Sequence, residues 1–428
     1  MSTEEIAGIK HKMDIRIHPS HISGIVAAPP SKSLTQRAIA AGLLATGTTV
    51  IRHASFCNDS LAAIRMAETL GAHVSIEDGI ITVLAGLRPL YPVSLHCGES
   101  GLALRMFAPI ASLLNPYVSI TGEGSLTGRP VNMVADALAQ LGLTVVTNGG
   151  FLPMKLTGKI SERKALIDGS SGSQLLTGLL MAMPLLNSDS EINVENLKSK
   201  PYISLTLQLL SDFGISIENH DFKRFFIPGN QSYRAHEYTV EGDWSGAAFL
   251  LVAGAIAGEV TVSNLNCESK QADLAIMQAL TDTGCTLTKS GAGLNISRSE
   301  LRAFTFDATD CPDLFPPLAA LASYSSGVSR IKGVSRLAHK ESNRSKAIIQ
   351  VLNELNIKAY IEGDDLLIAG GEVRGALISS HNDHRIAMMA AVMALTATGE
   401  VTITGAEAVA KSFPDFYEAM TRLGTLVC

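Results

Sequence analysis

The sequence lacks the features that mark secreted, membrane-spanning and nucleic-acid-binding proteins. Its six cysteines form no CxxC pair, which indicates neither a zinc site nor a disulfide framework, and reduced thiols in a cytosolic protein are the expected state. The longest apolar runs, 175–186 and 246–258, are shorter than the roughly 18 residues that a membrane-spanning helix needs. A net charge of −6 argues against a protein that binds nucleic acid through a basic surface.

The N-terminal segment has no apolar core and carries Glu4 and Glu5, so no secretory signal is predicted. What the chain does have is apolar bulk, because hydrophobic residues make up 46% of its 428 positions and charged residues 17%. This composition argues against disorder and predicts a large core divided among roughly two to three domains. We therefore expect a folded cytoplasmic protein.

One sequence signature recurs every 68 to 72 residues. An amphipathic helix ends in an apolar residue followed by glycine, or once by asparagine, and a short β-type alternation follows. Such a residue fits the left-handed conformation that caps the C-terminus of a helix. The six positions are Gly71, Gly142, Gly214, Gly284, Asn356 and Gly424.

A second kind of helix alternates with the first and is apolar nearly all round, which predicts that it is buried. Each is followed by a strand-like alternation such as TVIR or VTIT. Every repeat therefore reads β-α-β-α-β-β, with one buried and one surface helix. The fold class is α/β, and six such units of about 70 residues give two lobes of three.

The buried helices begin at polar segments that read PSKS, GESG, SSGSQ, GDWSG, CPD and NDHR. Parallel helices would bring these N-termini together, and their unpaired N–H groups and dipoles favour anions. Ordinary N-capping explains the same residues, and it is compatible with anion binding. In an acidic chain, basic residues near these ends indicate a small ligand with several negative charges; they are Lys32, Arg37, Arg129, Lys200, Lys340, Arg344, Arg385 and Lys411.

The motifs at these helix ends resemble those of the 5-enolpyruvylshikimate-3-phosphate synthase family of enolpyruvyl transferases. The resemblance covers essentially the whole chain, and the motifs follow one another in the order of the family. They are PPSKSLTQRAIAAGLLATG, CGESGLALRMF, TGRPVNMVADAL, GSSGSQLLTGLL, SKPYISLTLQLLSDFG, VEGDWSGAAF, CPDLFPP, RLAHKESNR, NDHRIAMMAAVMAL and AKSFPDFYEAM.

The resemblance implies the two-lobed, inside-out α/β barrel of the enolpyruvyl transferases, with discontinuous lobes. One lobe is expected to comprise residues 31–240, and the other residues 1–30 together with 241–428. The active site is expected in the cleft between them, and closure of the lobes over ligand would exclude water.

The implied reaction transfers the enolpyruvyl group of phosphoenolpyruvate to the 5-hydroxyl of shikimate 3-phosphate by addition and elimination, in the pathway to chorismate and aromatic amino acids. Cationic side chains neutralise the phosphates, so no metal or organic cofactor is expected. His381 and His384 are spaced like a metal pair, but no third ligand accompanies them. The family further implies a monomer, with glyphosate as an inhibitor that competes with phosphoenolpyruvate.

Residue roles follow from the matching motifs. The residues expected to bind shikimate 3-phosphate are Lys32, Ser33, Arg37, Ser173, Gln174, Ser199, Tyr202, Asp313 and Lys340. The residues expected to bind phosphoenolpyruvate are Lys32, Gly101, Arg129, Gln174, Arg344, Arg385 and Lys411. The expected catalytic residues are Asp313, which takes the proton of the 5-hydroxyl, and Glu341 or Lys32, either of which could protonate C3.

The sequence departs from the family pattern at several of these motifs. Gly172 stands where the family usually has the first of two serines, so a phosphate contact is lost or Ser171 replaces it. Arg336 stands where the family usually has Asn or Gln, which puts one shikimate contact in question. Leu102 replaces a threonine, and KESNR replaces the more common KESDR or KETDR.

The sequence disfavours two other functions. UDP-N-acetylglucosamine enolpyruvyl transferases share the fold and the donor, but they carry a loop cysteine and an asparagine after the first lysine. Here the loop reads GEGSLTGRP and Ser33 follows Lys32. A non-catalytic anion-binding protein is disfavoured because Asp313 and Glu341 would weaken anion binding unless they take part in chemistry.

Overall fold

The computed structural model describes residues 13–87, 89–338 and 340–428. The chain divides into two compact units. The first unit contains Pro30–Val240, and the second contains residues 13–29 together with Glu241–Cys428. No helix among the described residues is long and apolar enough to cross a membrane.

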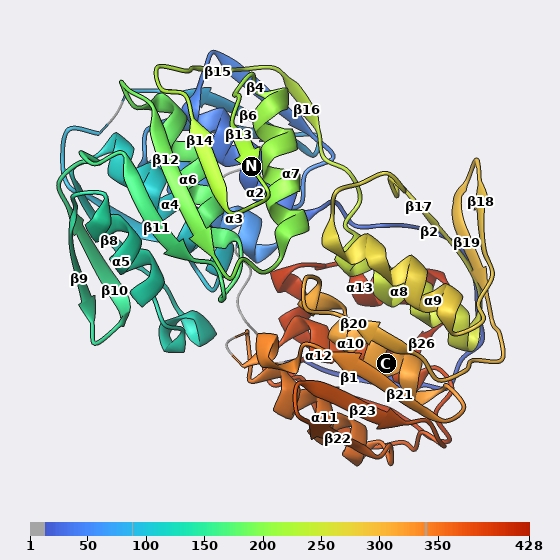
Figure 1. Cartoon of the computed structure of the whole chain (residues 1–428). Helices are drawn as coiled ribbons and strands as arrows, with labels where there is room; N and C mark the ends of the chain where they lie inside the picture. The colour runs from blue at the N-terminus through green and yellow to red at the C-terminus, as the bar shows by residue number, and fades with distance from the viewer. Residues whose placement is uncertain (1–12, 88, 339) are drawn as a thin grey trace. The chain divides into compact units, whose positions relative to one another are not determined.

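Each unit contains three four-stranded sheets within its described part (Figure 1). In the first unit the strand orders are β16 (Glu237–Thr239), β4 (Thr48–Arg52), β6 (Ile80–Ala85), β5 (Ala72–Glu77); β7 (Val93–His96), β8 (Tyr117–Thr121), β10 (Phe151–Thr157), β9 (Thr144–Asn148); and β11 (Lys164–Asp168), β12 (Ser190–Glu195), β14 (Arg224–Ile227), β13 (Glu218–His220). A short parallel pair, β3 (Ala45–Thr46) and β15 (Tyr233–Arg234), accompanies them.

In the second unit the orders are β18 (Leu287–Ser290), β19 (Gly293–Ser297), β17 (Gly258–Ser263), β2 (Ile22–Ala27); β20 (Thr305–Asp307), β21 (Val328–Lys332), β23 (Asp365–Ala369), β22 (Ala359–Glu362); and β24 (Leu377–Ser379), β25 (Val401–Thr404), β1 (Asp14–His18), β26 (Leu426–Val427). Each of the six sheets has one parallel pair at an edge, and its other pairs are antiparallel. This repetition confirms the predicted α/β fold of six similar units.

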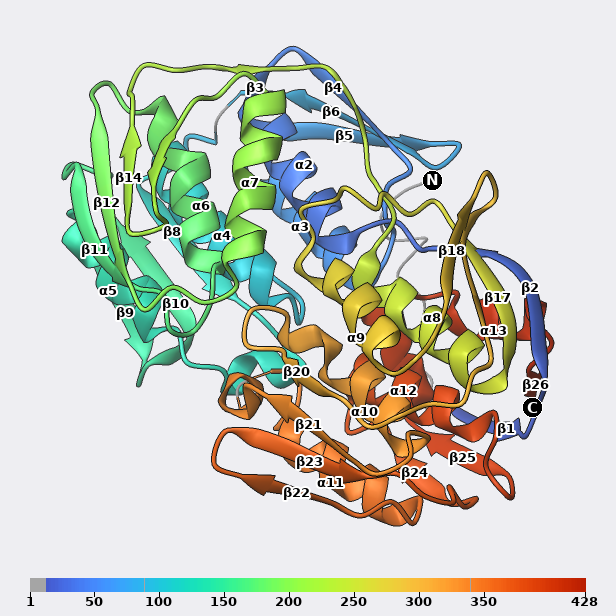
Figure 2. The same cartoon turned by 45° about the vertical axis from the view of Figure 1, so that its right-hand side comes forward.

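The sheets of each unit enclose three buried helices, as Figure 2 shows for α8, α10 and α12. The buried helices are α2 (Lys32–Leu44), α4 (Gly101–Leu114), α6 (Gln174–Ala182), α8 (Trp244–Ala257), α10 (Phe315–Ser323) and α12 (His384–Ala394). All residues of α8 are buried, as its lack of a polar face predicts.

A more amphipathic helix accompanies each buried helix and exposes its polar face. These helices are α3 (Asn58–Thr69), α5 (Asn132–Gln140), α7 (Lys200–Asp212), α9 (Ile276–Asp282), α11 (Arg344–Glu354) and α13 (Phe416–Arg422). The predicted cap residue follows each of them with a positive φ, between 68° at Asn356 and 104° at Gly424. The left-handed caps predicted from the repeat are therefore confirmed.

Two strands depart from the simple order of the repeat. In four repeats the strand before the buried helix pairs in parallel with the strand after it, as β7 pairs with β8. The strand β2 precedes α2 but pairs with β17 of the second unit, and β16 precedes α8 but pairs with β4 of the first unit. The chain passes between the units after each of these strands, so each completes a sheet of the unit that it leaves.

Candidate active site

In the first unit, the three buried helices begin at serines: Ser31, Ser100 and Ser173 are the N-cap residues of α2, α4 and α6. The Ser100 hydroxyl accepts a hydrogen bond from the Ala103 N–H at 3.2 Å and donates one to Gln36 Oε1 at 3.1 Å. Helix α4 packs against both α2 and α6. These neutral caps leave the positive helix ends available to a ligand anion.

Arg37 is buried in the first unit, with 1% of its surface exposed, and its partners are neutral. Its Nε donates to Thr206 Oγ1 at 3.0 Å, Nη1 to the Ser33 carbonyl at 2.9 Å and Nη2 to Thr177 Oγ1 at 3.4 Å. Burial lowers the pKa of Arg37 to about 10, although the nearby phenol of Tyr202 partly opposes this effect. An anion placed beside this guanidinium would supply the opposite charge that these partners lack.

Lys32, the first residue of α2, lies beside an acid that the sequence motifs had not singled out. Its ammonium donates to Asp59 Oδ2 at 3.1 Å, and 15% of the Lys32 side chain is exposed. Asp59 lies in the first turn of α3, where the helix dipole favours a carboxylate. That position was the available sequence signal, but it is also common for an acid with no part in binding.

Gly101 opens α4 amid cationic and amide side chains. An added Cβ would lie 2.9 Å from Arg105 Nη1, 3.1 Å from Arg129 Nη1 and 3.6 Å from Gln174 Oε1. Arg105 donates to the Gly101 carbonyl at 3.2 Å and to Gln174 at 3.3 Å. The structure thus brings together three of the predicted phosphoenolpyruvate-binding residues, Gly101, Arg129 and Gln174, and adds Arg105, which was not among the predicted site residues.

The remaining predicted residues of the first unit lie at helix starts. Ser173 is buried just before α6, and Gly172 precedes it with a φ of 128°, a conformation that L side chains rarely adopt. This explains the glycine in place of the usual serine. Ser199 is the N-cap of α7 with a left-handed φ of 58°, and its carbonyl accepts from the Tyr202 N–H.

In the second unit the corresponding helices begin at acids. Asp243 and Asp383 are the N-cap residues of α8 and α12, and each accepts a backbone N–H within its own first turn. Asp313 lies in η4 (Pro312–Leu314), which leads directly into α10. Since α8, α10 and α12 pack against one another, the second unit contains a group of carboxylates where the first has hydroxyls.

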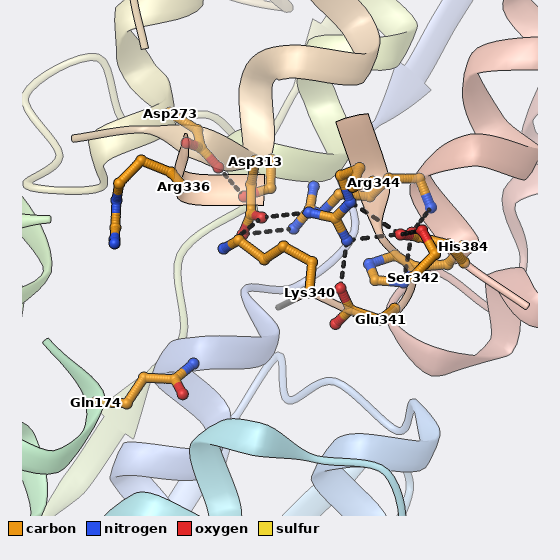
Figure 3. Close-up of polar contacts among 12 residues, drawn as sticks. Gln174, Asp273, Asp313, Arg336, Lys340, Glu341, Ser342, Arg344 and His384 are labelled. Atoms are coloured by element: carbon orange, nitrogen blue, oxygen red, sulfur yellow. Dashed lines mark hydrogen bonds and ion pairs between the residues drawn. The ribbon is translucent and has the colours of Figure 1, made fainter. Parts of the chain in front are cut away.

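Arg344 lies at the centre of these acids, with none of its side chain exposed (Figure 3). Its Nη1 donates a hydrogen bond to Asp313 at 2.9 Å. Its Nε and Nη2 donate to the two carboxylate oxygens of Asp383 at 2.9 Å and 3.1 Å. Nη2 also donates to Glu341. Burial disfavours its charge, but Asp383, Glu341 and Asp313 together raise the pKa of Arg344 above its ordinary value.

Asp313 has three cationic partners. Besides Arg344, Lys340 Nζ lies 3.3 Å from Oδ1 and Arg385 Nη2 lies 3.2 Å from Oδ2. Burial would raise the pKa of Asp313, yet the charges of Arg385, Lys340 and Arg344 hold it well below its usual range. Burial also lowers the pKa of Lys340, which the carboxylate of Asp313 only partly opposes.

The structure therefore brings five predicted residues into one cluster of the second unit: Asp313, Lys340, Glu341, Arg344 and Arg385. The sequence motifs did not indicate two further acids. Asp383 forms a salt bridge with Arg344, and Asp273 is close enough to Asp313 for the two charges to interact. Asp383 stands within the quoted motif NDHR, and its place as an N-cap could have indicated it.

Two further predicted or noted cations of the second unit are Lys411 and Arg336. Lys411 is the last residue of η6 (Ala406–Lys411), which packs against α12, and 7% of its surface is exposed. Arg336 donates to the Thr309 carbonyl at 3.3 Å and lies on the other side of Asp313 from Arg344 (Figure 3). Its guanidinium adds positive charge where the family usually has a neutral amide.

Comparisons with known proteins agree over nearly the full chain. The family described as EPSP synthase (3-phosphoshikimate 1-carboxyvinyltransferase) matches residues 17–420. Curated 3-phosphoshikimate 1-carboxyvinyltransferases from Clostridium kluyveri and Methanosarcina acetivorans are both 36% identical, over 96% and 97% of this chain and 97% and 99% of their own. The EPSP synthase structure from Acinetobacter baumannii superposes with a TM-score of 0.81 at 25% identity, and the match covers 98% of this chain and all of that one.

Proposed function

The chain belongs to the EPSP synthase family, and from this premise we propose how its residues divide the reaction. The protein is a 3-phosphoshikimate 1-carboxyvinyltransferase of the shikimate pathway, and its substrates are phosphoenolpyruvate and shikimate 3-phosphate. It transfers the enolpyruvyl group to the 5-hydroxyl and releases phosphate.

The first unit is assigned the recognition of shikimate 3-phosphate, through Lys32, Ser33, Arg37, Ser173, Gln174, Ser199 and Tyr202. This assignment is supported by Arg37, a buried guanidinium with hydroxyl and carbonyl partners whose pKa burial lowers to about 10. An anionic group of the substrate would stabilise that charge.

Phosphoenolpyruvate is assigned to cations of both units, namely Lys32, Arg129, Arg344, Arg385 and Lys411, together with Gly101 and Gln174. These cations come from both of the predicted lobes, residues 31–240 and residues 1–30 with 241–428, of which 1–12 lie outside the described residues. Support comes from Gly101, whose surroundings include Arg105, Arg129 and Gln174.

The observation that carries the mechanism is the contact of Asp313 with three cations. A bound donor would offer its own carboxylate and phosphate to Arg344 and Arg385, which would weaken their hold on Asp313. The carboxylate could then accept the proton of the 5-hydroxyl as that oxygen bonds to C2 of phosphoenolpyruvate. Asp313 is thus held ionised in the free protein and becomes a stronger base as the substrates bind.

The addition also needs a proton at C3, which Glu341 or Lys32 would supply. The resulting tetrahedral intermediate loses the C3 proton again as its C–O bond to phosphate breaks. Cationic side chains around the departing phosphate would stabilise the charge that develops on it. No step of this reaction requires a group beyond the two substrates and the chain's own residues.

Replacing Asp313 with asparagine tests this mechanism. The amide keeps the size of the side chain but cannot accept the proton, so kcat should fall by about 10²–10⁴ while the Michaelis constants change less. Asp307→Asn is a matched control, because Asp307 pairs with Lys332 on the surface at 3.5 Å and faces no predicted site residue. Turnover of Asp313→Asn close to that of the control would refute the assignment.

The protein is further proposed to act as a monomer in the cytoplasm. The cysteines of the described residues are all free thiols, which fits a reducing compartment. Sedimentation equilibrium at micromolar protein concentration would test the proposed monomer, since a dimer would give twice the molar mass of the chain.

A further inference from the structure

Asp273 is a buried carboxyl to which the mechanism above gives no role. It lies in η3 (Ala272–Ala275), with 1% of its surface exposed, and its Oδ2 accepts a hydrogen bond from the hydroxyl of Ser245 in the first turn of α8. The neighbouring Gln271 fixes this segment to the start of α8, because its amide donates to the Gly242 carbonyl at 2.8 Å and accepts from the Trp244 N–H at 3.1 Å.

The charged groups that face Asp273 come from three sides of the second unit. Asp243 lies at the start of α8, Asp313 and the neutral thiol of Cys311 lie at η4, and Arg385 lies in the first turn of α12. Burial, followed by the charge of Asp313, raises the pKa of Asp273 to about 6, although Arg385 opposes the shift. The charge of Arg385 therefore favours the ionised form of both carboxyls, although the printed hydrogen bond of its guanidinium goes to Asp313.

Arg385 has a donor that is ready for a ligand. Its Nη2 binds Asp313 at 3.2 Å, whereas its Nη1 is buried and has no hydrogen-bond partner among the described residues. A ligand anion bound there would draw on the same positive charge that stabilises both carboxylates. The negative charge of the cluster would then exceed what its cations can neutralise, and the less supported carboxylate would be the first to protonate.

We propose that Asp273 is a positioning residue for the reaction: it takes up a proton when substrate engages Arg385, which leaves Asp313 as the charged carboxylate of the pair. Ser245 donates a hydroxyl hydrogen bond to Asp273, and three cations in contact with Asp313 hold that carboxylate ionised. Protonation of Asp273 removes a repelling charge beside the incoming anion and keeps Asp313 able to accept the hydroxyl proton. This inference rests on the proposed roles of Arg385 and Asp313.

Proton uptake on ligand binding tests the inference directly. The probe is 5-enolpyruvylshikimate 3-phosphate, the product, which cannot react backwards while phosphate is withheld. Titration calorimetry in phosphate-free buffers of different ionisation enthalpy gives the number of protons bound. If ligand binding raises the pKa of Asp273 further, the protein should take up a larger fraction of a proton at pH 7 than Asp273→Asn does.

Two variants sharpen the test. Asp282→Asn removes an exposed acid of α9 and should leave the uptake unchanged. Ser245→Ala keeps the carboxyl but removes a hydrogen bond that favours its charged form, so the uptake should move to higher pH. Equal uptake by the parent and Asp273→Asn would overturn the proposal. If Asp273→Asn does not fold, an unchanged pH profile of Ser245→Ala would do so instead.

The roles of Arg385 and Asp273 can fail separately. If Arg385 does not bind the substrate, Arg385→Gln should bind the product as tightly as the parent, and the proposed function would need revision. If Arg385→Gln loses affinity while Asp273→Asn takes up as many protons as the parent, only the role of Asp273 is wrong. Loss of turnover in Asp273→Asn with a shifted pH profile of kcat would accompany a positioning role.

Discussion

The two units share one architecture but differ in the residues that begin their buried helices. In the first unit these are Ser31, Ser100 and Ser173, which carry no charge. In the second, Asp243 and Asp383 begin α8 and α12, and Asp313 lies just before α10. The same helix ends are thus left positive in one unit and neutralised by carboxylates in the other.

Because of this difference, the buried arginines of the two units have different partners. Arg37 in the first unit is held by neutral oxygens, so its printed hydrogen bonds bring no opposite charge to it. Arg344 in the second unit already binds Asp313, Glu341 and Asp383, so its charge stabilises the fold before any ligand arrives. The comparison shows that a repeated fold can give its two units different charge distributions by changing one residue per helix start.

The largest expected effect tests this comparison with one arginine from each unit. Arg344→Gln removes the guanidinium that pairs with Glu341, Asp383 and Asp313, although Asp313 keeps its other cations, and should destabilise the second unit by about 3–5 kcal/mol. Arg37→Gln removes a desolvated charge whose partners keep other hydrogen bonds, such as the 3.0 Å contact of Thr177 with Thr206, and should change stability by about 1 kcal/mol or less.

The single tryptophan provides the measurement. Trp244 is fully buried at the start of α8, so its fluorescence in a urea titration follows the unfolding of the second unit. For Arg37→Gln, the affinity for shikimate 3-phosphate should fall while the urea transition of the first unit, followed by far-ultraviolet circular dichroism, stays in place. Equal destabilisation by the two substitutions would remove the distinction between the units.

An intermediate effect on ligand affinity is expected at Gly101, a residue of the first unit that is proposed to bind phosphoenolpyruvate. A methyl group there would approach Arg105 Nη1 at 2.9 Å and Arg129 Nη1 at 3.1 Å. Glyphosate, the longer ligand, should tolerate this less well than phosphoenolpyruvate. A crowded methyl is worth about 1–3 kcal/mol, so Gly101→Ala should weaken glyphosate inhibition by roughly 10–200-fold, with a smaller rise in the Michaelis constant of phosphoenolpyruvate.

Inhibition constants for the parent and for Gly101→Ala, measured at matched substrate saturation, decide the matter. Gly128→Ala is a control, because an added Cβ at Gly128 meets nothing within 4 Å. Equal constants for the parent and Gly101→Ala would show that Gly101 does not line the inhibitor's site.

The smallest expected effect compares the caps themselves. Ser100→Ala removes an oxygen that accepts from Ala103 and should cost about 1 kcal/mol of stability. Asp243→Asn keeps an oxygen for the Ser245 N–H, so the cap should survive and stability should change by only a few tenths of a kcal/mol. The melting temperatures of Ser100→Ala and Asp243→Asn, each compared with the parent, test these two expected changes in stability. A larger loss for Asp243→Asn would mean that its charge, and not its cap, supports the second unit.

Much of the fold could be predicted from local signals in the sequence. The apolar helices are buried, the cap residues have positive φ, and the six sheets repeat, as the periodicity indicated. The pairing of β2 with β17 and of β16 with β4 could not be predicted from the repeat. Pairing between strands far apart in the sequence is not encoded in the residues near each strand. The discontinuous lobes were expected only through the family resemblance.

The candidate site was predicted in part. The motifs indicated Asp313, Lys340, Glu341, Arg344 and Arg385, and the structure gathers them into one cluster. The acids Asp59, Asp273 and Asp383 were not identified, since an acid in the first turn of a helix is common and its cation can lie anywhere in the chain.

The sequence by itself determined the repeat, the buried helices with their caps, and the polar residue at each helix start, because these depend on contacts within a few residues. Only the tertiary structure decided which charge meets which. Arg344 reaches Asp313 and Asp383 across 31 and 39 residues because the packed helices α10 and α12 bring their starts together. Such pairs form through the geometry of packing and not through the spacing of residues along the chain.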